Sequence, residues 1–340
     1  MTVGQRLPHE GRLSTAICLI AALPVSACVS SVDGSSQEPL PQPIEQTKRA
    51  ARTELCAGRT EPGVWQPDKD GVTHVDVDTR HCGLGGDPLY FTSLGGDASH
   101  WAARGATSIY RSSNTGFRVV VLRPQAPELA ERAAWYVNWM AQNPDVQSPG
   151  LCTGRTDSRS FKQYEDGGVR VKVDLRHCGF KEPPVVLTSL GGVEGHAATR
   201  GATSLYDVSV DGFTVFIQKP GITTAQAEAW GWHINWSASP PKNDGGEYCT
   251  GKSTFTDTLW KQYGANGLST RLTTEGCAAP LVFATLSGDR SHWYTTGASS
   301  IYGADDSGFR IYVNRSGVTP AFASDNGWHV HWTRVTPTVR

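Results

Sequence analysis

Apolar and polar residues alternate with a period of two along several short stretches of the chain. The segments 72–79 (VTHVDVDT) and 169–175 (VRVKVDL) follow this alternation, which is typical of a half-buried β-strand. Apolar runs that begin at Pro and end at Gly, at 88–96, 184–192 and 280–288, predict buried strands. The pattern therefore predicts a protein built mainly from short strands.

One stretch of this pattern occurs three times. The segment SLGGDASHWAARGATSIY (93–110) returns as SLGGVEGHAATRGATSLY (189–206) and as TLSGDRSHWYTTGASSIY (285–302). The central histidines are spaced by 96 residues, which is the length of a small domain and too long for a solenoid unit. With a short opening strand near Trp65, Phe161 or Trp260, each copy holds about six strands. We therefore expect an all-β fold of three tandem six-stranded antiparallel β-sandwiches, at 54–143, 150–240 and 247–336.

The stretch before the last strand of each copy has a different character. Residues 127–134 (PELAERAA) and 223–230 (TTAQAEAW) have helical character and predict a short crossover, either helical or irregular. The joins between copies are rich in Pro, Gly and Asn, which is typical of linkers. These joins allow either compact packing of the three copies around a pseudo-threefold axis or beads on a string.

The eight cysteines separate into an N-terminal group and three pairs. Cys18 and Cys28 lie near the N-terminus, and the other six fall two to a copy, with separations of 26, 26 and 28 residues. An exported chain meets an oxidising compartment, so one disulfide per copy is expected. No CxxC motif is present, and we predict no metal and no cofactor. The expected disulfides are Cys56–Cys82, Cys152–Cys178 and Cys249–Cys277.

The N-terminus reads as an export signal. Residues 1–27 combine a basic leader with a short apolar run that ends in small residues, as signal peptides do. Val25-Ser26-Ala27-Cys28 resembles a bacterial lipobox, which implies a lipid anchor on Cys28. Residues 28–53 are rich in Ser, Pro and Gln and predict a flexible linker. We therefore expect a lipoprotein held by lipid in the bacterial cell envelope, at the outer membrane or cell surface.

Charge and motifs exclude two classes of function. The chain has 31 basic and 32 acidic residues, so it has no basic excess with which to bind nucleic acid. It contains no GxSxG, HExxH or P-loop motif, and we expect no enzyme.

The order of strands and motifs resembles the H-type lectin domain. The matching residues in the second copy are the strand 184–190, the Leu205-Tyr206 pair, the Gly212-Phe213 turn and the last strand 232–236, and equivalents occur in the other copies. The resemblance implies a six-stranded antiparallel sandwich, binding of an N-acetylgalactosamine-type sugar and threefold assembly. The arginine that the family places before the Leu-Tyr pair is replaced by Ser108, Ser204 and Ser300, so the sugar specificity does not carry over.

Loops on rigid β-scaffolds commonly carry binding residues. An exposed Trp can stack on a sugar ring, and His or Asn can bond its hydroxyls. The repeated loop and the outward face of the last strand therefore supply the predicted ligand-binding residues: His100, Trp101, His196, His292, Trp293, Asn138 and Asn235. The alternative is that the loop residues pack between strands.

These residues predict a surface lipoprotein that binds a glycan or glycoconjugate through multivalent lectin-like repeats. The competing hypothesis is a non-catalytic adhesion or structural protein that binds another protein through the same repeats.

Overall fold

The computed structural model describes residues 55–68, 71–144, 150–165, 167–242, 246 and 248–338. The described chain is 46% strand and 14% helix, which confirms the all-β class. It forms one compact unit, which we divide by sequence into repeats 1, 2 and 3. The expected signal peptide, the Cys28 anchor and the linker lie outside the described residues.

Each repeat contains seven strands and one short α-helix, where the sequence predicted six strands. In repeat 1 the elements are β1 (Leu55–Arg59), β2 (Gln66–Pro67), β3 (Val72–Asp78), β4 (Leu89–Gly95), β5 (Ser108–Ser113), β6 (Gly116–Leu122), α1 (Ala126–Arg132) and β7 (Tyr136–Gln142). In repeat 2 they are β8 (Cys152–Arg155), β9 (Lys162–Tyr164), β10 (Gly168–Asp174), β11 (Val185–Gly191), β12 (Ser204–Tyr206), β13 (Gly212–Gln218), α2 (Thr224–Ala229) and β14 (His233–Ser239). In repeat 3 they are β15 (Tyr248–Lys252), β16 (Lys261–Tyr263), β17 (Gly267–Thr273), β18 (Leu281–Ser287), β19 (Ser300–Asp305), β20 (Gly308–Asn314), α3 (Pro320–Asp325) and β21 (His329–Val335).

The additional strand of each repeat is the one that carries its first cysteine. These strands, β1, β8 and β15, each hold a glycine directly under the indole of the last strand. A Cβ atom on Gly58 would lie 2.6 Å from the Trp139 ring, and one on Gly154 would lie 2.5 Å from the Trp236 ring. Glycine is therefore required for this close approach, and it also weakens the sequence signal for a strand.

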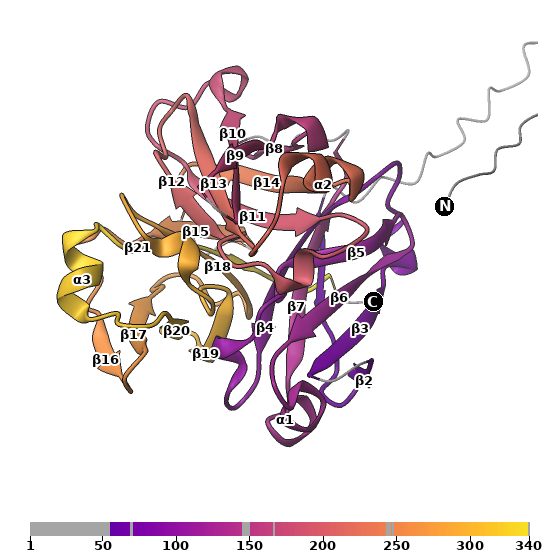
Figure 1. Ribbon diagram of the computed structural model, residues 1–340, viewed down its shortest axis with the longest axis horizontal. Coiled ribbons are helices and arrows are strands. Elements are labelled where there is room, and N and C mark those ends of the chain that lie inside the picture. Colours follow the sequence, from indigo (N-terminus) through magenta and orange to yellow (C-terminus); the bar gives the residue numbers. More distant parts are fainter. Residues whose placement is uncertain are drawn as a thin grey trace, which may run out of the picture. The chain divides into compact units, whose positions relative to one another are not determined.

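The three seven-stranded sheets are shared between repeats. Each sheet joins three strands of one repeat to four strands of a neighbour, in the orders β1-β7-β4-β19-β20-β17-β16, β15-β21-β18-β12-β13-β10-β9 and β2-β3-β6-β5-β11-β14-β8. Parallel pairs form the joins: β4 with β19, β18 with β12, and β11 with β5. The sheets are thus antiparallel within a repeat and parallel where repeats meet, which corrects the purely antiparallel prediction (Figure 1). Because each repeat pairs with both others, the chain closes into a ring.

The hydrophobic core has three similar parts and one shared part. Within each repeat, strands of its two sheets enclose a buried cluster around the Trp that immediately precedes the last strand: Trp135, Trp232 and Trp328, each fully buried. This arrangement of tandem sheets is sandwich-like. A fourth cluster contains residues of all three repeats, including Phe91, Leu187 and Phe283. The repeats are therefore joined by a common apolar core as well as by shared sheets.

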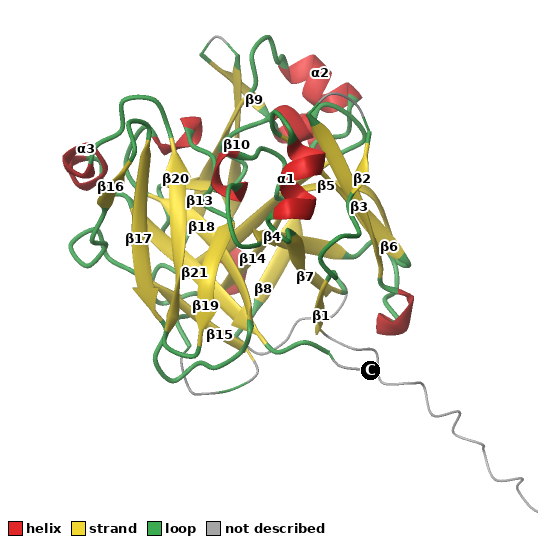
Figure 2. Cartoon of the chain, turned by 90° about the horizontal axis from the view of Figure 1, so that it is seen from below, coloured by secondary structure: helices red, strands yellow, loops and turns green. Residues whose placement is uncertain are grey.

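Two further sequence predictions are confirmed. The stretch before each last strand holds the helices α1, α2 and α3, which lie in connections between strands (Figure 2). The three expected disulfides are present, one in each repeat. Each links the cysteine-bearing first strand to the segment that follows the third strand, in a short loop of the same repeat.

Candidate functional site

The three predicted loop histidines lie buried between neighbouring repeats. In each case Nε2 of the histidine donates a hydrogen bond to a backbone carbonyl oxygen of a strand in a neighbouring repeat. The imidazole also stacks on the tyrosine after this carbonyl, with ring centroids 3.6–3.9 Å apart. The contacts are His100 with Ile301 and Tyr302, His196 with Ile109 and Tyr110, and His292 with Leu205 and Tyr206.

Burial also sets the protonation state of these histidines. The pKa of His100 and of His196 is lowered to about 4, and that of His292 to about 3, chiefly because burial disfavours the charged imidazolium. Their Nε2–oxygen distances are 2.8–3.1 Å, while Nδ1 lies 3.2–3.4 Å from a second carbonyl oxygen. A neutral ring has one N–H, and the shorter contact places it on Nε2. The histidines therefore hold repeats together and offer no exposed ring nitrogen to a ligand.

Serine and tyrosine of the same repeated segment complete this contact. Each tyrosine hydroxyl accepts a hydrogen bond from the backbone N–H that follows the histidine, at 2.7–2.9 Å. The serine two residues before each tyrosine donates to the carbonyl oxygen of that histidine; these serines are Ser108, Ser204 and Ser300. The repeated segment thus forms an interlock, a contact in which one repeat supplies the histidine loop and a neighbouring repeat supplies the strand with its serine and tyrosine.

The two predicted tryptophans also pack against a neighbouring repeat. Trp101 is half-buried over Gly267, with its ring 5.3 Å from that of Tyr263. Trp293 is buried over Gly168, with its ring 5.2 Å from that of Tyr164. The prediction of an exposed stacking surface on this loop therefore has no support in the positions of its residues. They serve packing, which was the alternative interpretation.

Asn138 and Asn235 lie in the same kind of environment on the last strands. Both are buried, and both donate through Nδ2 to a serine hydroxyl on the adjacent strand of their own sheet. Their Oδ1 atoms accept hydrogen bonds from Arg59 and Arg155, at 2.8 and 2.7 Å. These arginines extend to backbone carbonyls at the start of a neighbouring repeat's strand. The structure therefore does not bring the asparagines together with an exposed groove.

A groove lies instead between repeats 2 and 3, beside the equivalent positions of the last strand of repeat 3. Its cavity volume is about 410 Å³, and it is bounded by the end of β12, the start of β21 and the loop after β15. Phe255 forms one wall, and its side chain is 57% exposed. A second cavity of about 530 Å³ shares the segment 252–254 with the first and extends toward Trp332 and Arg271. Both cavities lie beside the end of β15 and the loop that follows it.

Polar side chains converge on the first of these cavities. Asp207 and Asp289 are exposed at its rim, and Lys252 donates to the carbonyl oxygen of Pro183. Nδ1 of His329 lies 2.8 Å from the carbonyl oxygen of Gly327, which identifies Nδ1 as the protonated nitrogen and leaves Nε2 as an acceptor. Burial lowers the pKa of His329 and keeps the ring neutral. The cavity thus combines an aromatic wall with hydrogen-bond donors and acceptors.

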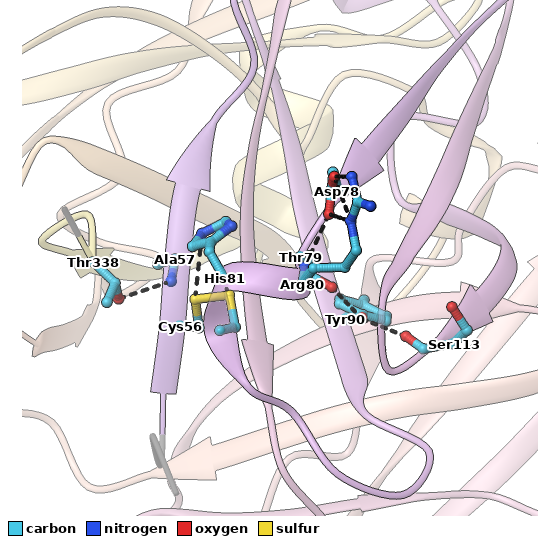
Figure 3. The surroundings of a disulfide bond; sticks show 10 residues. Cys56, Ala57, Asp78, Thr79, Arg80, His81, Tyr90, Ser113 and Thr338 are labelled. Atoms are coloured by element: carbon cyan, nitrogen blue, oxygen red, sulfur yellow. Dashed lines mark hydrogen bonds and ion pairs between the residues drawn. A yellow bond between two sulfur atoms is a disulfide. The ribbon is translucent and has the colours of Figure 1, made fainter. Parts of the chain in front are cut away.

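A histidine also lies beside the disulfide in repeats 1 and 2. Nε2 of His81 is 3.9 Å from Sγ of Cys56 and 3.6 Å from Sγ of Cys82, and the preceding Arg80 donates a hydrogen bond to Asp78 (Figure 3). His177 has the same relation to the disulfide of repeat 2. These are the His/Cys groups among the described residues whose spacing would suit a metal ion. Because both sulfurs of each pair are bonded to each other, they supply no thiolate ligands.

Sequence reasoning singled out the last-strand face but missed the groove residues Lys252, Phe255, Asp207 and Asp289. One signal was available, because the cysteine separation in repeat 3 is 28 residues where the other two are 26. The two additional residues fall in the loop that carries Phe255; the corresponding loops of repeats 1 and 2 are shorter and hold no aromatic residue ahead of Trp65 and Phe161. A departure from the repeat was therefore more informative about this groove than the repeat itself.

No family model, no curated protein and no solved structure matches this chain. Among the described residues, no helix has both the length and the apolar character needed to span a bilayer.

Proposed function

We propose that this protein is a non-catalytic, lipid-anchored lectin of the bacterial cell envelope that binds carbohydrate in the groove beside Phe255. The observation that carries the proposal is an exposed aromatic ring that forms one wall of a cavity with several convergent polar groups. Sugar sites have this composition, because an aromatic face stacks on the apolar face of a pyranose while fixed donors and acceptors bond its hydroxyls.

The polar groups are suited to hydroxyls in both directions. The carboxylates of Asp207 and Asp289 accept hydrogen bonds, and Nε2 of His329 is a further acceptor. Lys252 donates, and burial lowers its pKa while one of its N–H bonds is directed to Pro183. A sugar hydroxyl is donor and acceptor at once, so a mixed set of this kind binds it more completely than groups of a single type would.

The second cavity extends the proposal from a single sugar to an oligosaccharide. It adjoins the first along residues 252–254 and is lined by Asp257, Arg271 and Trp332. Two adjoining cavities suit two or more linked sugar units. Because the loop with Phe255 occurs only in repeat 3, we propose one extended site per chain in place of the three sites predicted from the repeats.

The resemblance to H-type lectins concerns the scaffold of this protein. Each repeat has two sheets around its own core, and the repeats close into a ring. We propose that this ring is the single-chain counterpart of the threefold assembly that the resemblance implies.

The proposal is tested by a glycan array with the compact unit from residue 49 to the C-terminus. Phe255→Ala should lower affinity for the bound glycans by about tenfold, because one stacking contact is worth on the order of 1 kcal/mol or more. Leu259→Ala is the matched control, because Leu259 is 72% exposed on the same loop and lines neither cavity. The proposal is abandoned if no glycan binds, or if Phe255→Ala binds as well as the wild type.

Protein binding is the second candidate, and one observation favours it. Phe255, Leu259 and Tyr263 are large, exposed side chains within nine residues of repeat 3. A protein partner would cover all three, whereas a sugar in the groove would contact Phe255 alone. Loss of a captured partner in Leu259→Ala, with no glycan bound by the wild type, would favour this candidate.

The anchor is tested separately. Cys28→Ala should move the protein from the membrane fraction to the soluble fraction of the envelope, because acyl chains on the thiol would be lost. An unchanged membrane fraction would overturn the lipid-anchor proposal.

A further inference from the structure

The three interfaces between repeats are built alike but are not filled alike. At two of them an indole from the loop covers a glycine at the start of a strand: Trp101 covers Gly267, and Trp293 covers Gly168. Each indole is surrounded by two more aromatic rings, Tyr263 and Tyr312 at one interface and Tyr164 and Phe216 at the other.

At the interface between repeats 1 and 2 the loop follows the same path without the indole. The loop backbone approaches a glycine of the neighbouring repeat in all three cases: Ala197 near Gly105, Trp293 near Gly201 and Trp101 near Gly297. The residues at the positions of the covered glycine and the two flanking rings are here Val72, Asp68 and Val120, as strand register shows. The whole aromatic set is therefore absent from this interface.

The absence leaves a cavity of about 550 Å³ beside Ala197. The residues that give it apolar surface are Tyr110, Val120, Leu122, Val193, Ala197 and Ala198. The volume lies within the range of small-molecule sites, roughly 300–1,000 Å³. The cavity thus has room for a planar ring next to the place where the other two interfaces hold one; Val72, which stands where they have the covered glycine, does not line it.

Charged groups without a protein partner face the same cavity. Arg111 and Asp68 line it, and neither forms a hydrogen bond or ion pair through its side chain with another described residue. Both are specific to this interface: the counterparts of Arg111 are Asp207 and Gly303, which share its positive φ of 51–52°. Arg118 also lines the cavity, but Asp76 binds it through two hydrogen bonds.

A buried histidine on β3, His74, also has a ring nitrogen that lacks a hydrogen-bond partner among the described residues. His74 is 8% exposed, and its Nδ1 is buried with no hydrogen-bond partner. On β3 it is paired with Val120 of β6, so it lies on the same face of the sheet as this lining residue of the cavity. An unpartnered buried nitrogen is costly unless a bound molecule or water satisfies it.

We propose that the cavity between repeats 1 and 2 binds a free aromatic amino acid, whose ring packs beside Ala197, where the indole is missing, while Arg111 binds its carboxylate and Asp68 its ammonium group. A zwitterion matches one unpaired cation and one unpaired anion, which a purely anionic or cationic aromatic would not. The site is independent of the groove beside Phe255, and it would stand if no glycan bound there.

The experiment is a calorimetric titration of the unit from residue 49 with L-tryptophan, with indole and tryptamine as comparisons. We expect saturable binding of L-tryptophan with a dissociation constant of about 1 mM or tighter, from the usual affinity per atom for a ligand of this size. Indole and tryptamine lack one or both charges and should bind at least about tenfold more weakly. No L-tryptophan binding at 10 times that concentration, on the order of 10 mM, overturns the proposal, as does equal binding of indole.

Variants of the two unpaired charged lining residues test whether L-tryptophan binds in this cavity. Arg111→Gly reproduces the residue found at the same backbone position in repeat 3, so it should fold normally and bind L-tryptophan about tenfold more weakly. Asp68→Asn should have a similar effect. The control is Arg290→Ala, with unchanged binding expected. Arg290 is an exposed arginine in the loop before His292, which corresponds in repeat 3 to the loop before His196.

Ala197→Trp combined with Val72→Gly restores the indole and the glycine beneath it. This variant should lose L-tryptophan binding and unfold at a higher temperature than the wild type, because the ring fills the cavity. If it binds L-tryptophan unchanged, the cavity is not the site. If it fails to fold, Arg111→Gly and Asp68→Asn decide, and unchanged binding in both overturns the proposal.

Discussion

Acid should lower the free energy of unfolding of this protein through the histidines buried between its repeats. The contribution of one of them, His292, can be measured separately with a variant. The folded pKa of His292 is about 3, while an unfolded histidine titrates near 6.5. Below pH 6.5 this histidine is therefore protonated in the unfolded chain but remains neutral in the folded chain. Stability is fully present above pH 6.5 and falls as the pH is lowered toward the folded pKa.

The magnitude follows from the width of that window. Each histidine costs about 1.4 kcal/mol per pH unit, or about 2.7 kcal/mol between pH 6.5 and 4.5. His100 and His196, with folded pKa values of about 4, contribute in the same window. The three together amount to about 8 kcal/mol by pH 4.5, which is comparable to the whole free energy of unfolding of a typical domain. Burial also lowers the pKa of four other histidines, which steepen the wild-type curve: His74, His233, His329 and His331.

The assay is urea unfolding followed by tryptophan fluorescence at several pH values between 7 and 4.5. His292→Gln keeps an N–H that can donate to Leu205 but cannot titrate, so it should be less stable at pH 7 and lose less stability on acidification. The expected difference in slope is about 1.4 kcal/mol per pH unit. His196→Gln should give the same difference at another interface. Equal slopes in wild type and both variants would refute the assignment of acid sensitivity to these histidines.

Three further predictions concern packing and covalent links. Trp293→Ala should lower the free energy of unfolding by about 3–5 kcal/mol, measured by urea unfolding, because it empties an aromatic cluster over Gly168; a change below about 1 kcal/mol would contradict the packing role. Gly154→Val should destabilise by at least about 1–3 kcal/mol in the same assay, because a Cβ would lie 2.5 Å from the Trp236 ring; a neutral result would show that the indole moves freely. The double variant Cys249→Ser with Cys277→Ser should lose about 3.5 kcal/mol on the chain-entropy model of a 28-residue loop, and a thermal midpoint equal to the wild type would argue against that contribution.

Local pattern was sufficient for most of the fold. Alternation located the third strand of repeats 1 and 2, Pro-to-Gly runs located the fourth strand of each repeat, and export chemistry with cysteine spacing located the disulfides. The first strand was missed because Gly58, Gly154 and Gly251 interrupt it, and the reason for these glycines is an indole about 80 residues away.

The candidate residues were harder to interpret because their partners lie in another repeat. His100 bonds to a carbonyl 201 residues away, and His196 to one 87 residues away. A polar loop with His and Ser between two glycines has the composition of an exposed binding loop, and nothing within one repeat distinguishes that from a buried interlock. Only the parallel pairing of β4 with β19 and its two counterparts brings loop and strand together.

Covalent fusion explains why the three interfaces can differ. In a trimer of identical chains, replacing the loop tryptophan by alanine would open all three interfaces at once, at about 3–5 kcal/mol for each buried indole. In one chain the change at Ala197 affects a single interface, and Val72, Asp68 and Val120 can change with it while Gly168 and Gly267 keep their indoles. The same freedom gives repeat 3 its loop with Phe255. The repeated residues hold the ring together, so the positions at which one repeat departs from the others are the places to look for function.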